Sequence, residues 1–272
     1  MTNKHAAFIG SIPEIYDAHL GPYLFEFSAR DLANRIKDKM AVDGTILEVA
    51  CGTGISTYHL RQALPADVQI KATDLNPAML DYARKKHADL PGVTFDLADA
   101  SSLSFDDHFF DAVVCQFGIM FFPDKAQGIA EMARTLKPGG TLAFNVWDSM
   151  EKNKSVAIAH ETISSFFNDN PPQFLHTPFG FHDVEHIKTL LSEAGFENIG
   201  VHPVTEKLVI HDTEHLAKGF VEGNPGVLEI NERASVNAET VTKATARALE
   251  QAYGNSPIEI EFHEIVFIAS KP

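Results

Sequence analysis

A short apolar run that ends in two glycines restricts the fold of this chain more than any other segment. Residues 45–50 have the pattern of a buried strand, Gly52 and Gly54 interrupt it, and a helical pattern follows over residues 56–63. Glycine adopts positive φ at low cost and lets a ligand come close to the backbone. In open α/β sheets, ligands bind at the carboxyl ends of such strands. The segment therefore predicts a binding site on a parallel sheet.

The alternation of strands and helices continues as far as Trp147. Further strands are predicted over residues 68–73, 93–97, 110–116 and 141–147. Helices are predicted over residues 16–40, 77–87 and 125–136, the last one stopped by Pro138. Strands that alternate with helices indicate a parallel sheet with helices on both faces.

The pattern changes after Trp147. Helices are predicted over 153–167 and 184–194, around a loop rich in proline and aromatic residues, and a strand over 201–210. Further helices over 214–251, interrupted near Gly223, precede an alternating strand over 258–269. We therefore expect three parts: an N-terminal helical cover (1–44), a binding core (45–147), and a segment (148–272) that completes the sheet and adds helical lid inserts over a substrate pocket.

Charge and composition exclude several classes of partner. The chain has 272 residues, 22 Lys and Arg against 37 Asp and Glu, and a net charge of −15. This acidity argues against nucleic acids and anionic membranes. No apolar run approaches the roughly 20 residues of a membrane span, and residues 1–10 do not have the pattern of a signal peptide. We expect a cytoplasmic protein without a metal, in which Cys51 and Cys115 are small buried hydrophobic residues.

Asp74 is the main candidate for a ligand contact beyond the glycine turn. It lies twenty residues past Gly54, at the end of the second strand, where a carboxylate can accept hydrogen bonds from both hydroxyls of a ribose. The alternative is an exposed residue beside a helix start, since Asn76 before Pro77 suits an N-cap. The spacing favours the ribose contact. Thr57 stands where dinucleotide-binding folds have a third glycine, which argues against NAD or NADP.

Five segments together carry a resemblance to a known family. In order and spacing they resemble the motifs of class I S-adenosylmethionine (SAM)-dependent methyltransferases, and most of all the broad group with the ubiquinone and menaquinone methyltransferases. The segments are Glu48–Gly54, Asp74–Leu80, Asp96–Phe105, Phe110–Gln116 and Arg134–Gly140. Ala98 departs from the pattern, because a glycine is common there.

The resemblance implies a fold and an activity. The fold is a Rossmann-like, seven-stranded, mostly parallel sheet with helices on both faces and a helical lid. The activity is transfer of a methyl group from SAM to a small-molecule acceptor by in-line displacement, which leaves S-adenosylhomocysteine (SAH). A SAM-binding protein without catalysis and an NAD(P)-linked oxidoreductase remain alternatives, and the chain is expected to be a monomer or a homodimer.

The resemblance also implies roles for individual residues. Gly52 and Gly54 would flank the amino-acid part of SAM, with Ala50 and Cys51 in the same turn, and Glu48 would orient that turn or reach the amine through water. The ribose would be held by Asp74, and the adenine by Leu75, Met79, Ala98, Asp99 and Ala100. Near the methyl group would lie Gln116 and Phe117. Met79 on an amphipathic helix also suits ordinary core packing.

The sequence does not identify a catalytic base. His160, His176 and His182 fall in or beside the loop region where an acceptor would lie, but a histidine in such a place is more often structural. As residues of the acceptor pocket we expect Tyr16, Tyr23, Trp147 and His176. Ordinary packing of the cover is an equally good explanation of the aromatic ones.

Overall fold

The computed structural model describes residues 7–272, and the first six residues of the expected N-terminal cover lie outside this range. Seven strands form one sheet in the order β3-β2-β1-β4-β5-β7-β6. Strand β7 is antiparallel to both of its neighbours, and the other pairs are parallel. The strands are β1 (Thr45–Val49), β2 (Gln69–Asp74), β3 (Val93–Leu97), β4 (Phe110–Gln116), β5 (Leu136–Trp147), β6 (Glu197–Ile210) and β7 (Ile258–Ser270). The predicted seven-stranded, Rossmann-like sheet is confirmed.

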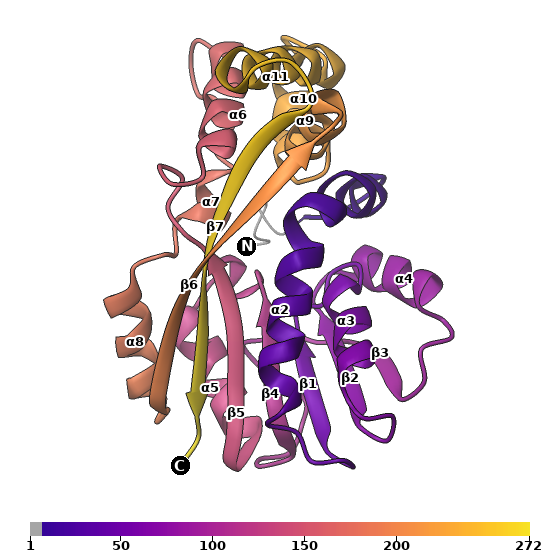
Figure 1. Ribbon diagram of the computed structural model, residues 1–272, viewed down its shortest axis with the longest axis vertical. Coiled ribbons are helices and arrows are strands. Elements are labelled where there is room, and N and C mark those ends of the chain that lie inside the picture. The colour runs from indigo at the N-terminus through magenta and orange to yellow at the C-terminus, as the bar shows by residue number, and fades with distance from the viewer. Residues whose placement is uncertain (1–6) are drawn as a thin grey trace.

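Helices cover both faces of this sheet, and Figure 1 shows α2 and α3 in front of it. The helices that follow the strands are α3 (Ile55–Ala63), α4 (Pro77–Lys86), α5 (Lys125–Thr135) and α8 (Val184–Glu193). Successive side chains of the central strands point to opposite faces of the sheet, and they therefore pack in different hydrophobic cores. Ile46 and Val114 pack in the core that holds Leu32 of α2, whereas Leu47 and Val113 pack in the core on the other face. Burial on both faces explains the continuous apolar runs of β1 and β4.

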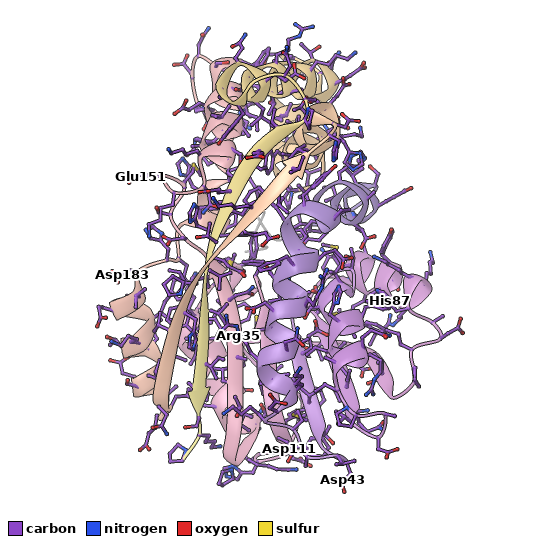
Figure 2. All side chains as sticks on the ribbon, in the orientation of Figure 1. Arg35, Asp43, His87, Asp111, Glu151 and Asp183 are labelled. Atoms are coloured by element: carbon purple, nitrogen blue, oxygen red, sulfur yellow. The ribbon has the colours of Figure 1, made fainter. Side chains whose placement is uncertain are left out.

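One carboxylate holds the amino-terminal ends of three neighbouring strands together. Asp111 accepts hydrogen bonds from the backbone N–H of Thr45 (2.8 Å) and from Nζ of Lys137 (2.7 Å). It therefore ties the starts of β1, β4 and β5 together. Figure 2 places Asp111 at the lower end of the molecule. The carboxyl ends of the parallel strands therefore point toward the upper end, where the helices of the lid described below pack together (Figure 1).

The helical pattern predicted over residues 16–40 is confirmed from Tyr16 to Lys37, but the segment is not one regular helix. The structure has a short helix α1 (Ile12–Ile15), a π-helical segment η2 (Tyr16–Phe25) and the α-helix α2 (Glu26–Lys37). Pro22 lies inside η2. Proline has no N–H to donate, and its ring collides with the carbonyl four residues earlier, so a wider turn accommodates it.

A long hairpin carries the helical lid. Strands β6 and β7 run past the end of the parallel strands, and helices inserted between them pack together at the top of Figure 1 with α6. The lid consists of α6 (Lys154–Ser165), α9 (Thr213–Glu222), α10 (Gly226–Arg233) and α11 (Ala238–Tyr253). Gly219 of α9 lies against η2 so closely that a Cβ there would be 2.4 Å from Leu20. The lid and the N-terminal cover thus close on each other, although the predicted three-part division stays a prediction.

Two further boundaries differ from the sequence prediction. Strand β5 begins at Leu136, five residues early, because Leu136 pairs with Phe110 before a register shift, after which the ladder resumes at Thr141. The loop expected before Asp183 contains a short helix, α7 (His176–Phe179), and a 3-10 turn, η3 (Ile119–Phe121), follows β4. Within residues 7–272, no helix is both long enough and apolar enough to span a bilayer.

Arg134 of α5 fixes the long connection between β3 and β4. Its guanidinium donates to the backbone carbonyls of Leu103 and Phe105, each at 2.8 Å, and pairs with Asp107 and Glu131. Glu131 in turn accepts a hydrogen bond from the Leu103 N–H at 2.8 Å. The Arg134 guanidinium thus satisfies two backbone carbonyls of the loop between β3 and β4, which borders the carboxyl end of the sheet.

We expect Arg134→Met to lower the free energy of unfolding by about 2–4 kcal/mol, because hydrogen bonds from a charged donor are worth about 1.5–3 kcal/mol each and the loss of several is partly offset by solvation. Urea denaturation measures the change. Arg30→Met, at an exposed position on α2, is the matched control and should stay within about 0.5 kcal/mol of the wild type. Equal stability of both variants would contradict this account of the loop.

Candidate active site

The turn after β1 is built from residues with positive φ. Ala50 (φ 58°), Gly52 (φ 56°) and Gly54 (φ 83°) alternate with ordinary residues, so the chain curls tightly at the carboxyl end of the strand. A Cβ on Gly52 would meet only Met79, at 4.0 Å, and would project into the cavity that both residues line. The absence of a side chain therefore leaves room for a ligand beside the backbone.

Asp74 holds this turn in place. Its Oδ2 accepts the Gly52 N–H at 2.8 Å, and its Oδ1 accepts the Asn76 N–H at 2.7 Å. Burial raises the pKa of Asp74, and the hydrogen bonds from Asn76, Gly52 and Leu75 oppose that rise. Asn76 also caps α4 by accepting from the N–H groups of residues 78 and 79. The capping and the ligand-facing carboxylate considered from the sequence are therefore compatible.

Glu48 lies behind the turn. It is 1% exposed, and its Oε2 accepts the Thr57 hydroxyl at 2.6 Å. Burial raises the pKa of Glu48 to about 7, partly opposed by Thr57 and Ser56. Its Oε1, the Thr53 hydroxyl and the Ser56 hydroxyl are all buried without a hydrogen-bond partner. A hydroxyl both donates and accepts, so Ser56, which lowers the Glu48 pKa, can supply a donor to this carboxylate, and a water molecule can complete the group.

The opposite side of the cavity is formed by the segments after β2 and β3. Leu75, 55% exposed, and Met79, 4% exposed, both line it. Asp99 lines it too, and its Oδ1 accepts the Ser101 N–H at 2.8 Å, which fixes the direction of the carboxylate. An apolar slot beside a fixed carboxylate suits a flat base with an exocyclic amine.

The end of β4 closes the cavity from the side of β5. Gln116 donates from Nε2 to the carbonyl of Phe25 at 3.0 Å, while its Oε1 is buried without a partner. Phe117 has a positive φ of 48°. Its ring stacks on Trp147 with centroids 3.9 Å apart and planes 7° from parallel.

The structure brings ten of the thirteen predicted cofactor residues to one cavity, which also contains Phe8, Tyr16 and Asn76. These ten are Ala50, Gly52, Asp74, Leu75, Met79, Ala98, Asp99, Ala100, Gln116 and Phe117. The other three do not line it. Glu48 lies behind the turn, Cys51 is a buried free thiol, and Gly54 packs against the imidazole of His87.

A second, apolar cavity adjoins the first beneath the lid. Four aromatic residues, Phe8, Tyr16, Phe117 and Phe121, line both cavities. The remaining lining is Leu20, Leu24, Phe25, Met120, Trp147, Val156, Phe174, Leu175, Pro178, Phe179, Phe220 and Asn224. Of the predicted acceptor residues, Tyr16 and Trp147 lie here.

The other predicted acceptor residues lie elsewhere. Tyr23 packs edge-on against His215 of the lid. His176 and His182 line a separate open groove beside Asp148, and His160 stacks edge-on against His176. Among residues 7–272, no three His, Cys, Asp or Glu side chains come together as a metal site. The absence of a metal stays a prediction.

Sequence reasoning missed two polar residues close to the junction of the cavities. Asn145 lies in the apolar run of β5, and Glu264 lies on β7. A signal for Glu264 was available, because the residue falls in the same alternation as Ile258, Ile260 and Phe262, all of which are buried. A carboxylate in the inward phase of a strand indicates a buried partner.

The comparisons with known proteins agree with this geometry. A model of a methyltransferase domain matches residues 46–140. The chain is 45% identical over 100 residues to the demethylmenaquinone methyltransferase of Deinococcus radiodurans, spanning 36% of this chain and 41% of that protein. It is 30% identical over 174 residues to that of Staphylococcus epidermidis, spanning 58% of this chain and 70% of the relative.

The chain belongs to the class I SAM-dependent methyltransferases. Phosphoethanolamine N-methyltransferase 2 of Haemonchus contortus, solved with SAM, shares the fold. The superposition covers 97% of this chain and 60% of that chain, with 17% sequence identity and a TM-score of 0.55. SAM is the cofactor of the family. The suspected resemblance is confirmed, and the NAD(P)-linked alternative is not supported.

The raised pKa of Glu48 predicts a pH dependence of stability. Between the unfolded value near 4.5 and the folded value of about 7, the unfolded state loses its proton first, so stability falls as the pH rises through this window. Glu48→Gln removes this proton. We expect the difference in unfolding free energy, wild type minus variant, to fall from pH 5 to pH 7.5 by up to about 1.4 kcal/mol per pH unit. Urea titrations at fixed salt measure it; a constant difference would refute the assignment.

Proposed function

We propose that this protein transfers a methyl group from SAM to a small, largely apolar acceptor held in the second cavity. The observation that carries the proposal is the direct adjacency of the two cavities through Phe8, Tyr16, Phe117 and Phe121. Methyl transfer requires two ligands in line at a common boundary, and water kept away from it.

The first cavity fits the parts of SAM. Oδ2 of Asp74 accepts the Gly52 N–H and Oδ1 accepts the Asn76 N–H, and the carboxylate, with about four acceptor sites, keeps capacity for a ribose hydroxyl. We assign the adenine to Leu75, Met79 and Asp99, and the amino-acid end to the Gly52 turn. The unpaired atoms around Glu48 suit a bound amine or a water beside it. When bound, SAM supplies the electrophilic methyl on a sulfonium, a cation that aromatic faces and carboxylates favour.

The second cavity sets the requirements for the acceptor. Among its described lining residues, Tyr16 is the only one with an ionisable side chain. Burial, and then the charges of Asp74 and Asp17, raise the pKa of Tyr16, so its phenol stays protonated and is no base at neutral pH. The acceptor must therefore bring a nucleophilic atom that needs no proton transfer to a side chain of this cavity.

A planar, electron-rich ring meets these requirements. Phe117, Trp147 and Phe179 line the cavity and their rings stack on one another. A ring that binds as its phenolate has already given its hydroxyl proton to water, so its oxygen attacks without a base, and attack through carbon releases the ring proton to water after the methyl group has transferred. The two curated relatives are named for demethylmenaquinone. We therefore propose an acceptor of the quinol type, methylated in the cytoplasm by a monomer or homodimer. The net charge of −15 argues against a nucleic-acid partner.

Asp74→Asn tests the cofactor site. The amide cannot accept both backbone N–H groups and both ribose hydroxyls, so we expect SAH and SAM to bind at least about tenfold more weakly, a loss of 1.4 kcal/mol or more. Titration calorimetry measures the affinity. Asp81→Asn, on the exposed side of α4, should bind as the wild type does. Wild-type affinity in Asp74→Asn would refute the ribose assignment, and a folded wild type that binds neither compound would refute the function.

Phe179→Ala tests the acceptor cavity separately. The ring stacks on Trp147 at 5.7 Å, and its removal takes away one aromatic wall without touching the cofactor cavity. We expect the KM for a quinol acceptor to rise about tenfold or more, while the SAH affinity stays within about twofold. Phe109→Ala, at an exposed phenylalanine, is the control. An unchanged KM, or turnover of phosphoethanolamine in place of a quinol, would count against the proposed acceptor.

A further inference from the structure

Two buried polar side chains link β7 to the end of β4. Asn145 of β5 is fully buried and Glu264 of β7 is 4% exposed. Asn145 donates from Nδ2 to Oε2 of Glu264 at 2.6 Å, and its Oδ1 accepts the Phe117 N–H at 3.1 Å. Two consecutive hydrogen bonds thus run from the carboxylate to the Phe117 N–H, which also donates to the backbone carbonyl of Asn145 at 3.3 Å.

Phe117 is the residue at which this link acts on the site. Its left-handed backbone costs roughly 1–2 kcal/mol for a residue with a Cβ, so the conformation depends on bonds that hold it. Its ring stacks on Trp147 and lines both cavities. A shift of Phe117 would therefore move the wall between the cofactor and the acceptor.

We propose that Glu264 is a positioning residue, which fixes the amide of Asn145 and through it the conformation of Phe117 at the boundary of the two cavities. The consequence for methyl transfer rests on the proposed function. The positioning itself depends only on the contacts within the chain.

The chemistry of the three groups explains why a carboxylate serves here. Oε2 of Glu264 accepts the Asn145 hydrogen bond whether the carboxylate is ionised or carries its proton on Oε1, so it selects the orientation in which Asn145 turns its NH₂ toward Glu264. The amide oxygen then faces the Phe117 N–H. The flipped amide would set its oxygen against Oε2 of Glu264 and its NH₂ against the Phe117 N–H, and both contacts would be repulsive.

The surroundings of Glu264 make a purely packing role a poor explanation. Burial raises its pKa to about 7, the Ser28 hydroxyl and Asn145 lower it, and its Oε1 has no hydrogen-bond partner. The nearby charges, Asp31 and Arg35 of α2, pair with each other at 2.5 Å; Figure 2 labels Arg35 on α2 in front of the sheet. An apolar side chain would fill this space without the cost of desolvating a carboxylate.

Trp147 supplies a readout that needs no ligand. It is the only tryptophan of the chain, and it stacks on Phe117. We would compare the emission spectrum and iodide quenching of Glu264→Met, Glu264→Gln and the wild type, with Glu259→Met as a control at an exposed position of the same strand. Circular dichroism shows that each variant is folded, and SAH titration follows.

We expect Glu264→Met to shift the emission of Trp147 and to weaken SAH binding roughly threefold to tenfold, the range of one hydrogen bond. Glu264→Gln should restore both properties, because the glutamine oxygen can still accept from Asn145, whereas a packing role would favour methionine. An unchanged emission in folded Glu264→Met would overturn the proposal. If that variant does not fold, Asn145→Ser removes the same link and should shift the emission.

Glu264 is also the cross-strand neighbour of Trp147, so a direct effect must be separated. We would repeat the comparison in Phe117→Leu, where the stacked ring is absent. The shift caused by Glu264→Met should largely vanish there; a full shift would overturn the proposal, because the effect would then bypass Phe117. A wild type that fails to bind SAH would refute the proposed function and leave these emission results valid.

Discussion

The site depends on one feature of the topology: after β1 and after β4, the chain continues toward opposite edges of the sheet. After β1 the chain passes through α3 to β2, and after β4 it passes through α5 to β5, on the opposite side. The carboxyl ends of these two neighbouring strands are therefore not covered by their own connections, and a crevice opens between them. Sheet pairing sets its width, since Ile46 to Glu48 align with Ala112 to Val114. Asp111 holds the other ends of the strands, so that the crevice stays fixed from below.

Polar side chains inside the apolar sheet make this crevice a shaped site. Backbone groups lose their ladder partners where β1 and β4 end, and a buried group of this kind must be satisfied. Asp74 does this for the Gly52 turn, and the Asn145 side chain adds a second acceptor to the Phe117 N–H, which the Asn145 backbone carbonyl accepts at 3.3 Å. Each of these side chains is fixed by a further contact, Asp74 by the Asn76 N–H and Asn145 by Glu264. Each wall of the crevice thus depends on one carboxylate, Asp74 or Glu264. Removing a carboxylate from water costs free energy, and here the hydrogen bonds that it makes fix the position of the wall.

The sequence sufficed for the parts of the structure that depend on local patterns. The runs over β3 and β4 and the gap near Gly223 between α9 and α10 were predicted within a residue, because apolar periodicity and glycine act locally. The widened turn at Pro22 was missed, since a proline in a helical pattern indicates a disturbance but not its form. Glu48 was predicted to orient the turn or to reach the amine through water, and its place behind the turn, where it accepts the Thr57 hydroxyl, could not be read from the sequence, because spacing along the chain does not tell which side of a strand faces the ligand. Asn145 and Glu264 are 119 residues apart, and their contact follows only from the pairing of β5 with β7.

That pairing also explains why lid and site are mechanically connected. Strand β7 carries Ile258 and Ile260 under the helical lid and Glu264 beside Trp147, so one continuous strand extends from the lid to the site. The lid meets the N-terminal cover where Gly219 lies against Leu20, and Leu20 lines the apolar cavity. The cavity is thus bounded by elements that are distant in sequence, among them η2, β5, α6, α7 and α9. Under the proposed function, the aromatic residues shared by the two cavities would both select the acceptor and keep water from the transfer boundary, because the same rings form the wall of each cavity.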